Sequence, residues 1–309
     1  MTNGSSRGLL CGLGQISSAN ITPALESSGV RTNFRAMGIL LKKIKDSVSS
    51  SQISGLLSWK FNQISNEIES KWRVVQAKGA TKQFACPICL FEGRFVTNRS
   101  SSGQRYAAIC PKCKSAERHR LQFLTMQELK KSIDFSELSL LHIAPEAALG
   151  KILRSWFGTY TTADINSAGV DVVVDLTAAD LPDESYDVVY ASHVLEHIPA
   201  DNLALKEIVR ILRPGGFAVL PVPLVCEVTI EYPEPVTTEF GHVRAPGYDY
   251  YERYEAHFSS IQTFSSEDFD ERYQLFVYED RSRYPTIACP YRVSSQGARH
   301  RDIVPIAYV

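Results

Sequence analysis

The stretch LPDESYDVVYASHVLEHIPADNLALKEIVRILRPGGFAVLPVP, from Leu181 to Pro223, predicts a strand, a helix and a second strand. Residues 186–192 form a short apolar run rich in β-branched and aromatic side chains, which is typical of a buried parallel strand. A helix is expected from Asp201, because apolar residues recur there every three or four positions until a Pro-Gly-Gly sequence ends the pattern. Residues 217–222 form the next strand, so the stretch is one strand-helix-strand unit of a parallel sheet.

Three earlier segments predict further strands of the same sheet. They cover residues 138–143, 160–163 and 170–174, and a helix with an apolar stripe is expected at 149–156. This alternation predicts an α/β fold, in which a doubly wound, mostly parallel sheet with helices on both faces occupies residues 134–309. In such sheets ligands bind at the carboxyl ends of the strands, so the residues that directly follow each strand are of most interest.

The composition is that of a folded protein of ordinary charge. Its 309 residues, 44% of them hydrophobic, can bury a sizeable core, and the net charge of −1 argues against a protein that coats nucleic acid over its whole surface. No apolar run approaches the roughly 18 residues that a transmembrane helix needs, and residues 1–15 show no secretory signal. We therefore expect a cytoplasmic location. The seven cysteines agree, since four form two Cys-x-x-Cys pairs and the others have no obvious disulfide mates.

Residues 1–80 are expected to form a partly ordered N-terminal segment with one amphipathic helix. Residues 1–52 are rich in Ser, Gly and Asn, whereas apolar residues recur at helical spacing over residues 57–75. The apolar stripe of that helix suits a dimer seam or, given the basic residues at 42–45, a membrane surface. A stripe of this kind more commonly packs on its own domain.

Two Cys-x-x-Cys pairs predict a zinc ribbon within residues 81–131, which also hold a linker helix. The first pair is Cys86 and Cys89, and the second, twenty residues later, is Cys110 and Cys113. Two short turns can bring four thiolates around one tetrahedral ion, the arrangement typical of structural zinc. Iron, as in rubredoxins, or a redox role would use the same residues. A ribbon this small needs a metal to fold, which favours a structural ion.

The predicted ribbon is locally basic. One interpretation is an RNA-binding module, and the other is a small domain with solvated basic side chains that covers an edge of the catalytic domain. Few aromatic residues are present to stack on bases, which favours the second interpretation. The basic residues are Arg94, Arg99, Arg105, Lys112, Lys114, Arg118 and Arg120.

The helix expected from Glu117 carries apolar residues on more than one side. Leu121 and Leu124 fall broadly on one side, whereas Phe123 and Met126 fall on the other. This pattern is typical of a helix packed between two partners, here the ribbon and the sheet.

Several motifs resemble those of class I S-adenosylmethionine-dependent methyltransferases of the type-11 group. Residues 186–198 and the Leu-Arg-Pro-Gly-Gly at 212–216 resemble the fourth strand, its loop and the fifth-strand entry of that group. The two Cys pairs, Ser-x-Glu-Arg-His-Arg at 115–120, Leu-His-Ile-Ala-Pro-Glu at 141–146 and residues 240–250 resemble a narrower family whose members carry a zinc ribbon. The resemblance covers about residues 84–280 and implies a Rossmann-like methyltransferase sheet that binds S-adenosylmethionine.

The turn after the first strand suits this cofactor better than a dinucleotide. Ala144-Pro145-Glu146 lacks the paired glycines, and at proline the N–H group, that would surround a pyrophosphate. S-adenosylmethionine carries no phosphate but has a sulfonium and an ammonium group. A site lined by Glu146, Asp164 and Asp175 is therefore electrostatically suitable for it and unfavourable for NAD. We expect the methionine moiety to lie against Ala144 and Glu146.

The remaining cofactor contacts are predicted at the ends of later strands. Asp164 ends the second strand, at the position where an acid accepts hydrogen bonds from both ribose hydroxyls. The resemblance implies that Asp175 and Leu176 bracket the adenine, although Asp175 could instead serve as a turn former before Thr177. Ser192, directly after the fourth strand, is assigned to the cofactor side.

Methyl transfer needs alignment of the acceptor more than it needs a catalytic group, because it is an in-line displacement at the methyl carbon. A hydroxyl acceptor also needs a base, for which His193 and His242 are the candidates. Ordinary loop or core roles are the alternatives for both, and Glu196 and His197 are interpreted as structural or cofactor-side. Arg244, Tyr248 and Tyr250 suit an anionic or sugar acceptor, or they fix their loop. No Asn-Pro-Pro-Tyr sequence follows the fourth strand, so the signature of amino-adenine methyltransferases is absent.

The sequence therefore predicts an S-adenosylmethionine-dependent methyltransferase with a structural zinc ribbon, acting on a small-molecule or saccharide-like acceptor. An RNA methyltransferase guided by the ribbon is one alternative. A binding protein that keeps the fold and the cofactor but has lost catalysis is the other, and the glycine-poor turn is its best support.

Overall fold

The computed structural model describes residues 83–100, 103–166, 169–294 and 298–309. The helix predicted at residues 57–75 and the rest of the N-terminal segment lie outside the described residues. Residues 70–309 belong to one compact unit, which contains all of the described residues. None of the described helices is long and apolar enough to cross a membrane.

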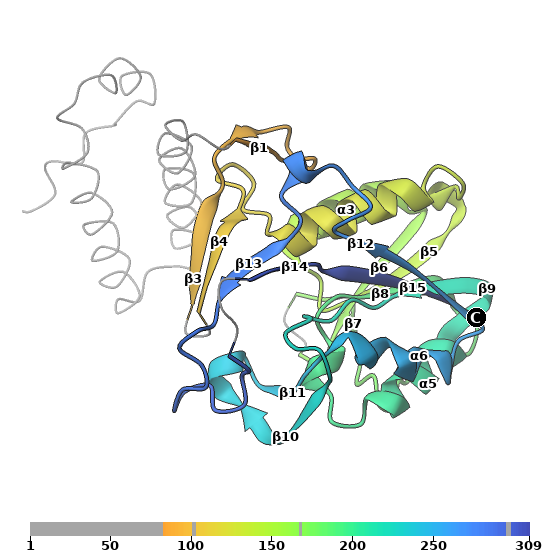
Figure 1. Cartoon of the computed structure of the whole chain (residues 1–309). Coiled ribbons are helices and arrows are strands. Elements are labelled where there is room, and N and C mark those ends of the chain that lie inside the picture. Colours follow the sequence, from red (N-terminus) through yellow and green to blue (C-terminus); the bar gives the residue numbers. More distant parts are fainter. Residues whose placement is uncertain (1–82, 101–102, 167–168, 295–297) are drawn as a thin grey trace, which may run out of the picture. The chain divides into compact units, whose positions relative to one another are not determined.

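A seven-stranded sheet forms the centre of this unit (Figure 1), with the strand order β12-β15-β9-β8-β5-β6-β7. All neighbouring pairs from β9 to β7 are parallel, whereas β15 runs antiparallel to both β9 and β12. The predicted α/β class and mostly parallel sheet are thereby confirmed. The strands are β5 (Ser139–Ile143), β6 (Thr159–Asp164), β7 (Val172–Val173), β8 (Tyr186–Ala191), β9 (Leu212–Val219), β12 (Ser260–Ser265) and β15 (Ile303–Tyr308).

Helices cover both faces of the sheet because successive side chains of its strands point to opposite faces. In β8, Val188 and Tyr190 belong to a buried cluster shared with α3 and α4, whereas Val189 and Ala191 belong to a second cluster shared with α5 and α6. Figure 1 shows α3 on one side of the sheet and α5 with α6 on the other. The four helices are α3 (Glu117–Leu129), α4 (Ala147–Trp156), α5 (Asp201–Ile211) and α6 (Glu252–Glu255).

The strand-helix-strand unit of the Leu181–Pro223 stretch is present as β8, α5 and β9. The helix ends at Ile211, and β9 begins at once, so the Arg-Pro-Gly-Gly sequence lies at the start of the strand, where Gly215 has a left-handed φ of 79°. A side chain at Gly216 would place its Cβ 2.7 Å from the backbone oxygen of Asp187. This close approach of two neighbouring strands explains why glycine occupies the position.

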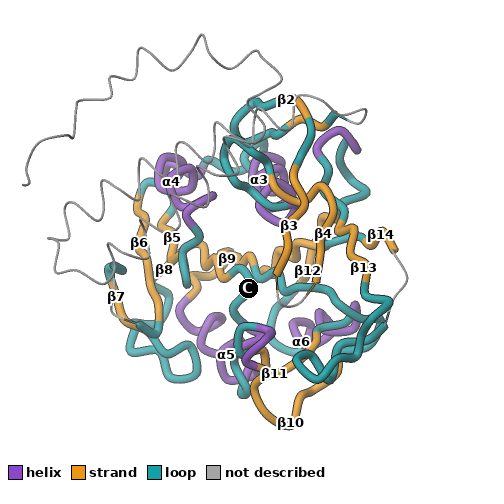
Figure 2. The backbone as a smooth tube through the Cα atoms, turned by 90° about the vertical axis from the view of Figure 1, so that its left-hand side faces the viewer, coloured by secondary structure: helices purple, strands orange, loops and turns teal. Residues whose placement is uncertain are grey.

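The predicted ribbon hairpin is completed by strands from the other end of the chain. Its strands β3 (Val96–Ser100) and β4 (Gly103–Ile109) lie in a four-stranded antiparallel sheet with β13 (Val277–Asp280) and β14 (Ala298–His300). Figure 2 shows these four strands side by side. The sequence division near residues 131–134 therefore separates two parts that share a sheet in space.

Short elements complete the described chain. The hairpin of β10 and β11 follows the loop after β9 and carries His242 at its second strand. These elements are β1 (Phe84–Ala85), β2 (Glu92–Gly93), β10 (Ile230–Val236), β11 (His242–Ala245) and the 3-10 turns Phe135–Glu137, Leu195–His197, Thr237–Glu239, Tyr248–Tyr251 and Glu271–Tyr273.

Candidate functional site

The four ribbon cysteines form one compact sulfur cluster. The Sγ atoms of Cys86 and Cys113 are 3.6 Å apart, as are those of Cys89 and Cys110, and all four ligand atoms lie within 4.8 Å of one another. Four sulfur atoms around a tetrahedral zinc ion, each bonded at about 2.3 Å, would be separated by about 3.8 Å. The geometry therefore fits zinc as predicted, and these cysteines are proposed to hold it.

The two cysteine turns have the same backbone design. Leu90 and Lys114, each directly after the second cysteine of its pair, have φ angles of 57° and 63°. Each residue donates its N–H to the carbonyl oxygen of the first cysteine of its pair, at 2.9 Å in both turns. These left-handed residues close each turn and point its two sulfur atoms toward the same place.

Helix α3 joins the ribbon to the sheet, as the pattern of its apolar residues predicted. Its fully buried Arg120 donates hydrogen bonds to the carbonyl oxygens of Ala108, Ser115, Tyr273 and Gln274, at 2.6 to 3.0 Å. Farther along the helix, the side chain of Gln122 contacts the sheet: it accepts a hydrogen bond from the hydroxyl of Tyr190 and donates one to the hydroxyl of Ser192. The helix therefore fixes the ribbon relative to the carboxyl ends of the central strands.

Glu146 begins α4 at the turn after β5, and its carboxylate is already compensated. Its Oε1 accepts hydrogen bonds from Arg118 and lies 2.9 Å from Nε2 of His119, whereas its Oε2 accepts from Ser192 at 3.2 Å. Burial opposes ionisation of Glu146, but these partners outweigh it and hold the pKa of the carboxyl well below its usual range. The Ser115–Arg120 motif thus supplies two side chains that position the turn, which the sequence alone did not reveal.

The acids predicted to bind the cofactor follow neighbouring strands on one edge of the sheet. Asp164 ends β6 next to β5, and its Oδ1 accepts from the N–H and the side-chain amide of Asn166. Its Oδ2 has no partner among the residues that the structure describes. Exposed Asp175 follows β7, and its Oδ1 accepts from the N–H and hydroxyl of Thr177, the geometry of the turn former weighed above. Leu176 is buried beside it.

A cavity of about 430 Å³ lies at the same edge of the sheet. Both strand-end residues on its wall, Ala144 and His193, have left-handed φ angles of 47° and 56°, which turn the chain sharply after β5 and β8. The ribbon hairpin contributes Asn98 and Arg105 to the wall. The cavity therefore brings together the following predicted site residues: Ala144, Glu146, Ser192, His193 and His242. The structure does not place Asp164, Asp175, Leu176, Arg244 or Tyr248 on this wall.

Glu196 is fully buried in the wall of this cavity, in the midst of histidines. Its Oε1 lies 3.5 Å from Nδ1 of His193 and 3.9 Å from Nε2 of both His197 and His242. Neither of its oxygens has a hydrogen-bond partner among the described residues. Burial raises the pKa of Glu196 to about 8 and lowers that of His242 to about 3. The sequence interpretation of Glu196 and His197 as structural or cofactor-side missed this cluster, since only folding brings His242 to them.

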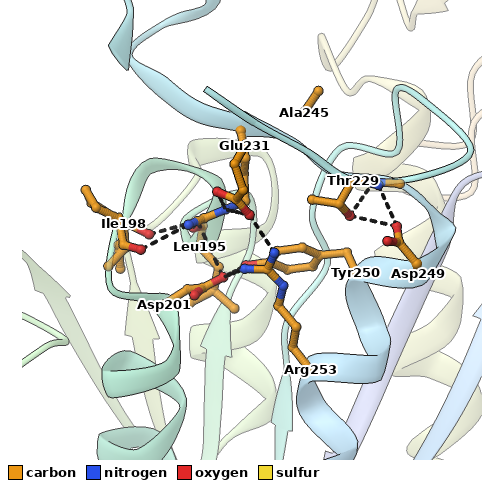
Figure 3. A network of polar contacts seen from close by, with 12 residues as sticks. Leu195, Ile198, Asp201, Thr229, Glu231, Ala245, Asp249, Tyr250 and Arg253 are labelled. Atoms are coloured by element: carbon orange, nitrogen blue, oxygen red, sulfur yellow. Dashed lines mark hydrogen bonds and ion pairs between the residues drawn. The ribbon is translucent and has the colours of Figure 1, made fainter. Parts of the chain in front are cut away.

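Arg244 is hydrogen-bonded to the loop that carries Glu196. The buried guanidinium donates to the carbonyl oxygens of Leu195, Ile198 and Pro199 at 2.8 to 3.0 Å, and its Nε donates to the carboxylate of Glu231. Figure 3 shows how Leu195, Ile198 and Glu231 converge in this network. With these hydrogen bonds Arg244 fixes the loop at residues 195–199. Its contact with a methyl acceptor stays a prediction.

The two tyrosines that accompany Arg244 in the sequence have different surroundings. Tyr250 is fully buried and donates to Asp201 at 2.8 Å, whereas the half-buried Tyr248 donates to the backbone oxygen of Arg301 at 3.4 Å. Tyr250 thus joins the β11 segment to the start of α5. An acceptor contact of Tyr248 stays a prediction.

Asp302, a buried acid on the cavity wall, is expected to make stability depend on pH. Its pKa is raised from 3.8 to about 7, chiefly by burial and also by nearby Glu117, whereas the Ile303 N–H, Arg118 and Arg105 oppose the rise. Because the folded state then binds the proton more tightly than the unfolded state, stability should fall as pH rises from about 4 to about 7 and stay level above that range.

The variant Asp302→Asn has no carboxyl group to titrate, so its stability should not fall over this pH range. At pH 8 its free energy of unfolding should exceed that of the wild type by up to about 4 kcal/mol, the equivalent of the difference between the unfolded and folded pKa values of Asp302. Asparagine keeps an oxygen that can accept from the Ile303 N–H, as Asp302 does. Urea unfolding of both proteins between pH 4 and pH 8 measures the difference. A wild-type advantage that is the same at every pH would contradict the assignment.

Comparison with known proteins assigns the central part of the sheet to a methyltransferase domain. Residues 135–220, from the turn before β5 to the end of β9, match the family model of a methyltransferase domain. This match confirms, over that segment, the resemblance to class I S-adenosylmethionine-dependent methyltransferases. No curated protein matches the chain significantly.

Solved structures give fold likenesses of low identity. The YcgJ protein from Bacillus subtilis is 14% identical, with 60% of this chain and 96% of that chain covered and a TM-score of 0.37. A SAM-dependent methyltransferase from Thermotoga maritima is also 14% identical, with 62% and 90% covered and a TM-score of 0.35. The MccD protein is 13% identical, with 60% and 96% covered and a TM-score of 0.40. Values this low support no inference about a substrate.

Proposed function

We propose that this chain, which carries a methyltransferase domain at residues 135–220, transfers the methyl group of S-adenosylmethionine to a small polar or saccharide-like molecule. One observation supports the proposal most. A single cavity adjoins the turn expected to contact the cofactor, at Ala144 and Glu146, and the two histidines expected to face the acceptor, His193 and His242.

The residues at the strand ends suit a phosphate-free cofactor. Asp164 offers a carboxylate oxygen without a described partner where the ribose hydroxyls are expected. The methionine end of the cofactor carries both an ammonium and a carboxylate group, and the cavity wall carries both signs of charge in Glu146 and Arg118, which pair with each other. Since Glu146 already pairs with Arg118 and is hydrogen-bonded to His119, we assign the cofactor's positive charge chiefly to Asp164 and, in second place, to Asp175.

The size and lining of the cavity favour a small polar acceptor. Its volume of about 430 Å³ lies within the range of small-molecule sites. Its wall carries many ionisable groups, a lining that suits a molecule with hydroxyl, amine or carboxylate groups. Those beyond the residues already assigned are Arg105, Glu239, Glu279, Arg292, His300 and Asp302. Some of them pair within the chain, as Arg292 does with Glu279 and Arg105 with Glu117.

Within this proposal the protein aligns the acceptor and receives its proton. The cofactor supplies an electrophilic methyl group, and alignment accounts for much of the acceleration. His193 is the first proposed base, because it lies two residues after the end of β8 and its buried Nε2 has no hydrogen-bond partner among the described residues. His242, on the same wall, is the second proposed base.

The structure gives the RNA hypothesis less support than the composition of the ribbon did. Arg120 donates hydrogen bonds to four backbone carbonyl oxygens. Arg118 pairs with Glu146, and Arg105 lies 3.4 Å from the buried Glu117. These contacts within the folded chain leave the three cations less available to a phosphate backbone. A cytoplasmic location stays a prediction.

Transfer of a labelled methyl group from S-adenosylmethionine into fractionated cell extract tests the proposal. We expect label in the small-molecule or saccharide fraction, and loss of that label with Asp164→Ala. Label confined to RNA would instead favour the RNA methyltransferase. Cofactor binding without label in any fraction would leave the non-catalytic binding protein as the function.

A further inference from the structure

We propose that Glu196, His197 and His242 form a second metal site, one that takes a divalent transition-metal ion at the wall of the cavity. The three side chains come from the loop after β8 and from β11, which the fold brings together. Their ligand atoms all lie within 4.8 Å of one another. Among the described residues, this is the one group besides the ribbon cysteines with such a geometry.

The distances suit a shared cation better than direct hydrogen bonds. Nε2 of His197 and Nε2 of His242 are each 3.9 Å from Oε1 of Glu196, beyond the roughly 3.2 Å of an N–H···O hydrogen bond. Two ligands bonded at about 2.0 to 2.1 Å to a tetrahedral ion would lie about 3.4 Å apart. A contraction of about half an ångström would therefore bring each histidine to ligand spacing from Glu196. The two histidine nitrogens, which lie within 4.8 Å of each other, would approach one another as well.

The buried carboxylate provides a second, independent observation. Glu196 is 0% exposed, and both of its oxygens lack a hydrogen-bond partner among the described residues. An ionised carboxylate in this position is costly unless a cation compensates it, because no donor replaces its lost hydration. A divalent ion between Glu196 and two imidazoles supplies that compensation.

The imidazoles are arranged as ligands usually are. The rings of His197 and His242 are nearly perpendicular, at 84°, with their centres 4.7 Å apart, so both can direct a nitrogen to one point without stacking. Arg244 holds the loop that carries Glu196 and His197 through three carbonyl groups.

The ligand set indicates the metal. Two histidines and one carboxylate form a set that zinc uses in catalytic sites, and iron(II) and other divalent ions use it as well. Three protein ligands leave at least one coordination position open, and all three residues lie on the cavity wall. An oxygen atom of a molecule in the cavity can occupy that position.

The consequence for methyl transfer rests on the proposed function. A hydroxyl group coordinated to the ion has a lower pKa and is a better nucleophile at neutral pH. In that case His242 acts on the acceptor through the metal. The metal site itself does not depend on this step.

Metal content and cobalt spectra test the site. The wild-type chain, loaded with zinc and then freed of excess ion, should hold about two ions, one in the ribbon and one in the cluster. His242→Ala and Glu196→Gln should each lose about one ion and keep the ribbon ion. His257→Ala is the matched control, because this histidine hydrogen-bonds Asn202 outside the cavity and should leave the content unchanged.

Cobalt(II) distinguishes the sites by ligand type. In the wild type its spectrum should contain thiolate charge-transfer bands from the ribbon and additional weaker bands of a nitrogen and oxygen site, and only the latter should vanish in His242→Ala. A wild-type chain with a single ion and pure thiolate bands would overturn the inference and indicate a neutral, protonated Glu196. Because cofactor binding is measured separately with S-adenosylmethionine, that result would leave the proposed methyl transfer standing.

Discussion

The variant Cys86→Ser is expected to lose the ribbon ion and to unfold at a temperature lower by about 10 °C or more. A structural zinc site contributes on the order of 10 kcal/mol of binding free energy, and losing even a third of it would shift the midpoint by about this amount in a domain of this size. The ribbon has few other means of stability, because its buried apolar cluster consists of Phe84, Phe95 and two of the cysteines. The loss should spread to the cavity, since β4 of the ribbon pairs with β13.

Metal analysis and thermal unfolding of the purified chain measure both effects. The matched control is Cys226→Ser, because Cys226 lies outside the ribbon and its Sγ donates only to the backbone oxygen of Ala245. That variant should keep its metal and nearly all of its stability. A Cys86→Ser chain with the full metal content would show that the four cysteines are not the ligands.

The second large effect is expected at Asp164, where replacement by alanine should weaken S-adenosylmethionine binding by about 100-fold. Hydrogen bonds to a charged acceptor contribute about 1.5 to 3 kcal/mol each, and a ribose offers two donors to one carboxylate. Thermal stability should change little, because Asp164 lies at the end of β6 and its described partner is the neighbouring Asn166. Calorimetric titration gives the affinity, and thermal unfolding provides the check on folding.

Asp183→Ala is the matched control for that titration. Asp183 precedes β8 and pairs with Arg210, so it lies at the amino end of the strands, away from the cavity. Its replacement should leave the affinity unchanged. Equal affinities of Asp164→Ala and the wild type would remove the ribose assignment.

The parts of the fold with local sequence signals were the predictable ones. Residues 186–211 could be interpreted because the β8 strand is apolar and aromatic except for Asp187, and the stripe of α5 has the period of a helix. Both depend on neighbours along the chain. The cysteine pairs were predictable for the same reason, since each turn is closed within five residues. The match at residues 135–220 confirms the resemblance that these local signals carried.

Features made by distant segments had no such signal. The pairing of Arg105 with Glu279 joins the ribbon to a strand more than 170 positions later, and nothing in either segment indicates the other. From the sequence, Arg244 could bind the methyl acceptor or fix a loop. In the structure its guanidinium donates hydrogen bonds to backbone carbonyl oxygens, and a sequence does not show which carbonyls will lie beside it. The cluster around Glu196 needs His242, which reaches it only because β11 packs beside that loop.

Among the site residues, positions could be predicted from topology, whereas contacts between distant segments could not. Ala144 and Glu146 follow directly from the end of β5, so their place on the cavity wall could be expected from topology alone. The compensation of Glu146 could not, because it depends on how α3 packs across the sheet. The electrostatic argument for the cofactor therefore rests more on Asp164 than the sequence suggested.

Calorimetry of the wild-type chain with S-adenosylmethionine, and with NAD as the comparison, is the most direct test of the central claim that the carboxyl edge of this sheet binds a positively charged nucleoside without phosphates. Saturable one-to-one binding of S-adenosylmethionine, with no heat from NAD, is the predicted result. Binding of NAD at this site, or no binding of either compound by folded protein, would contradict the account.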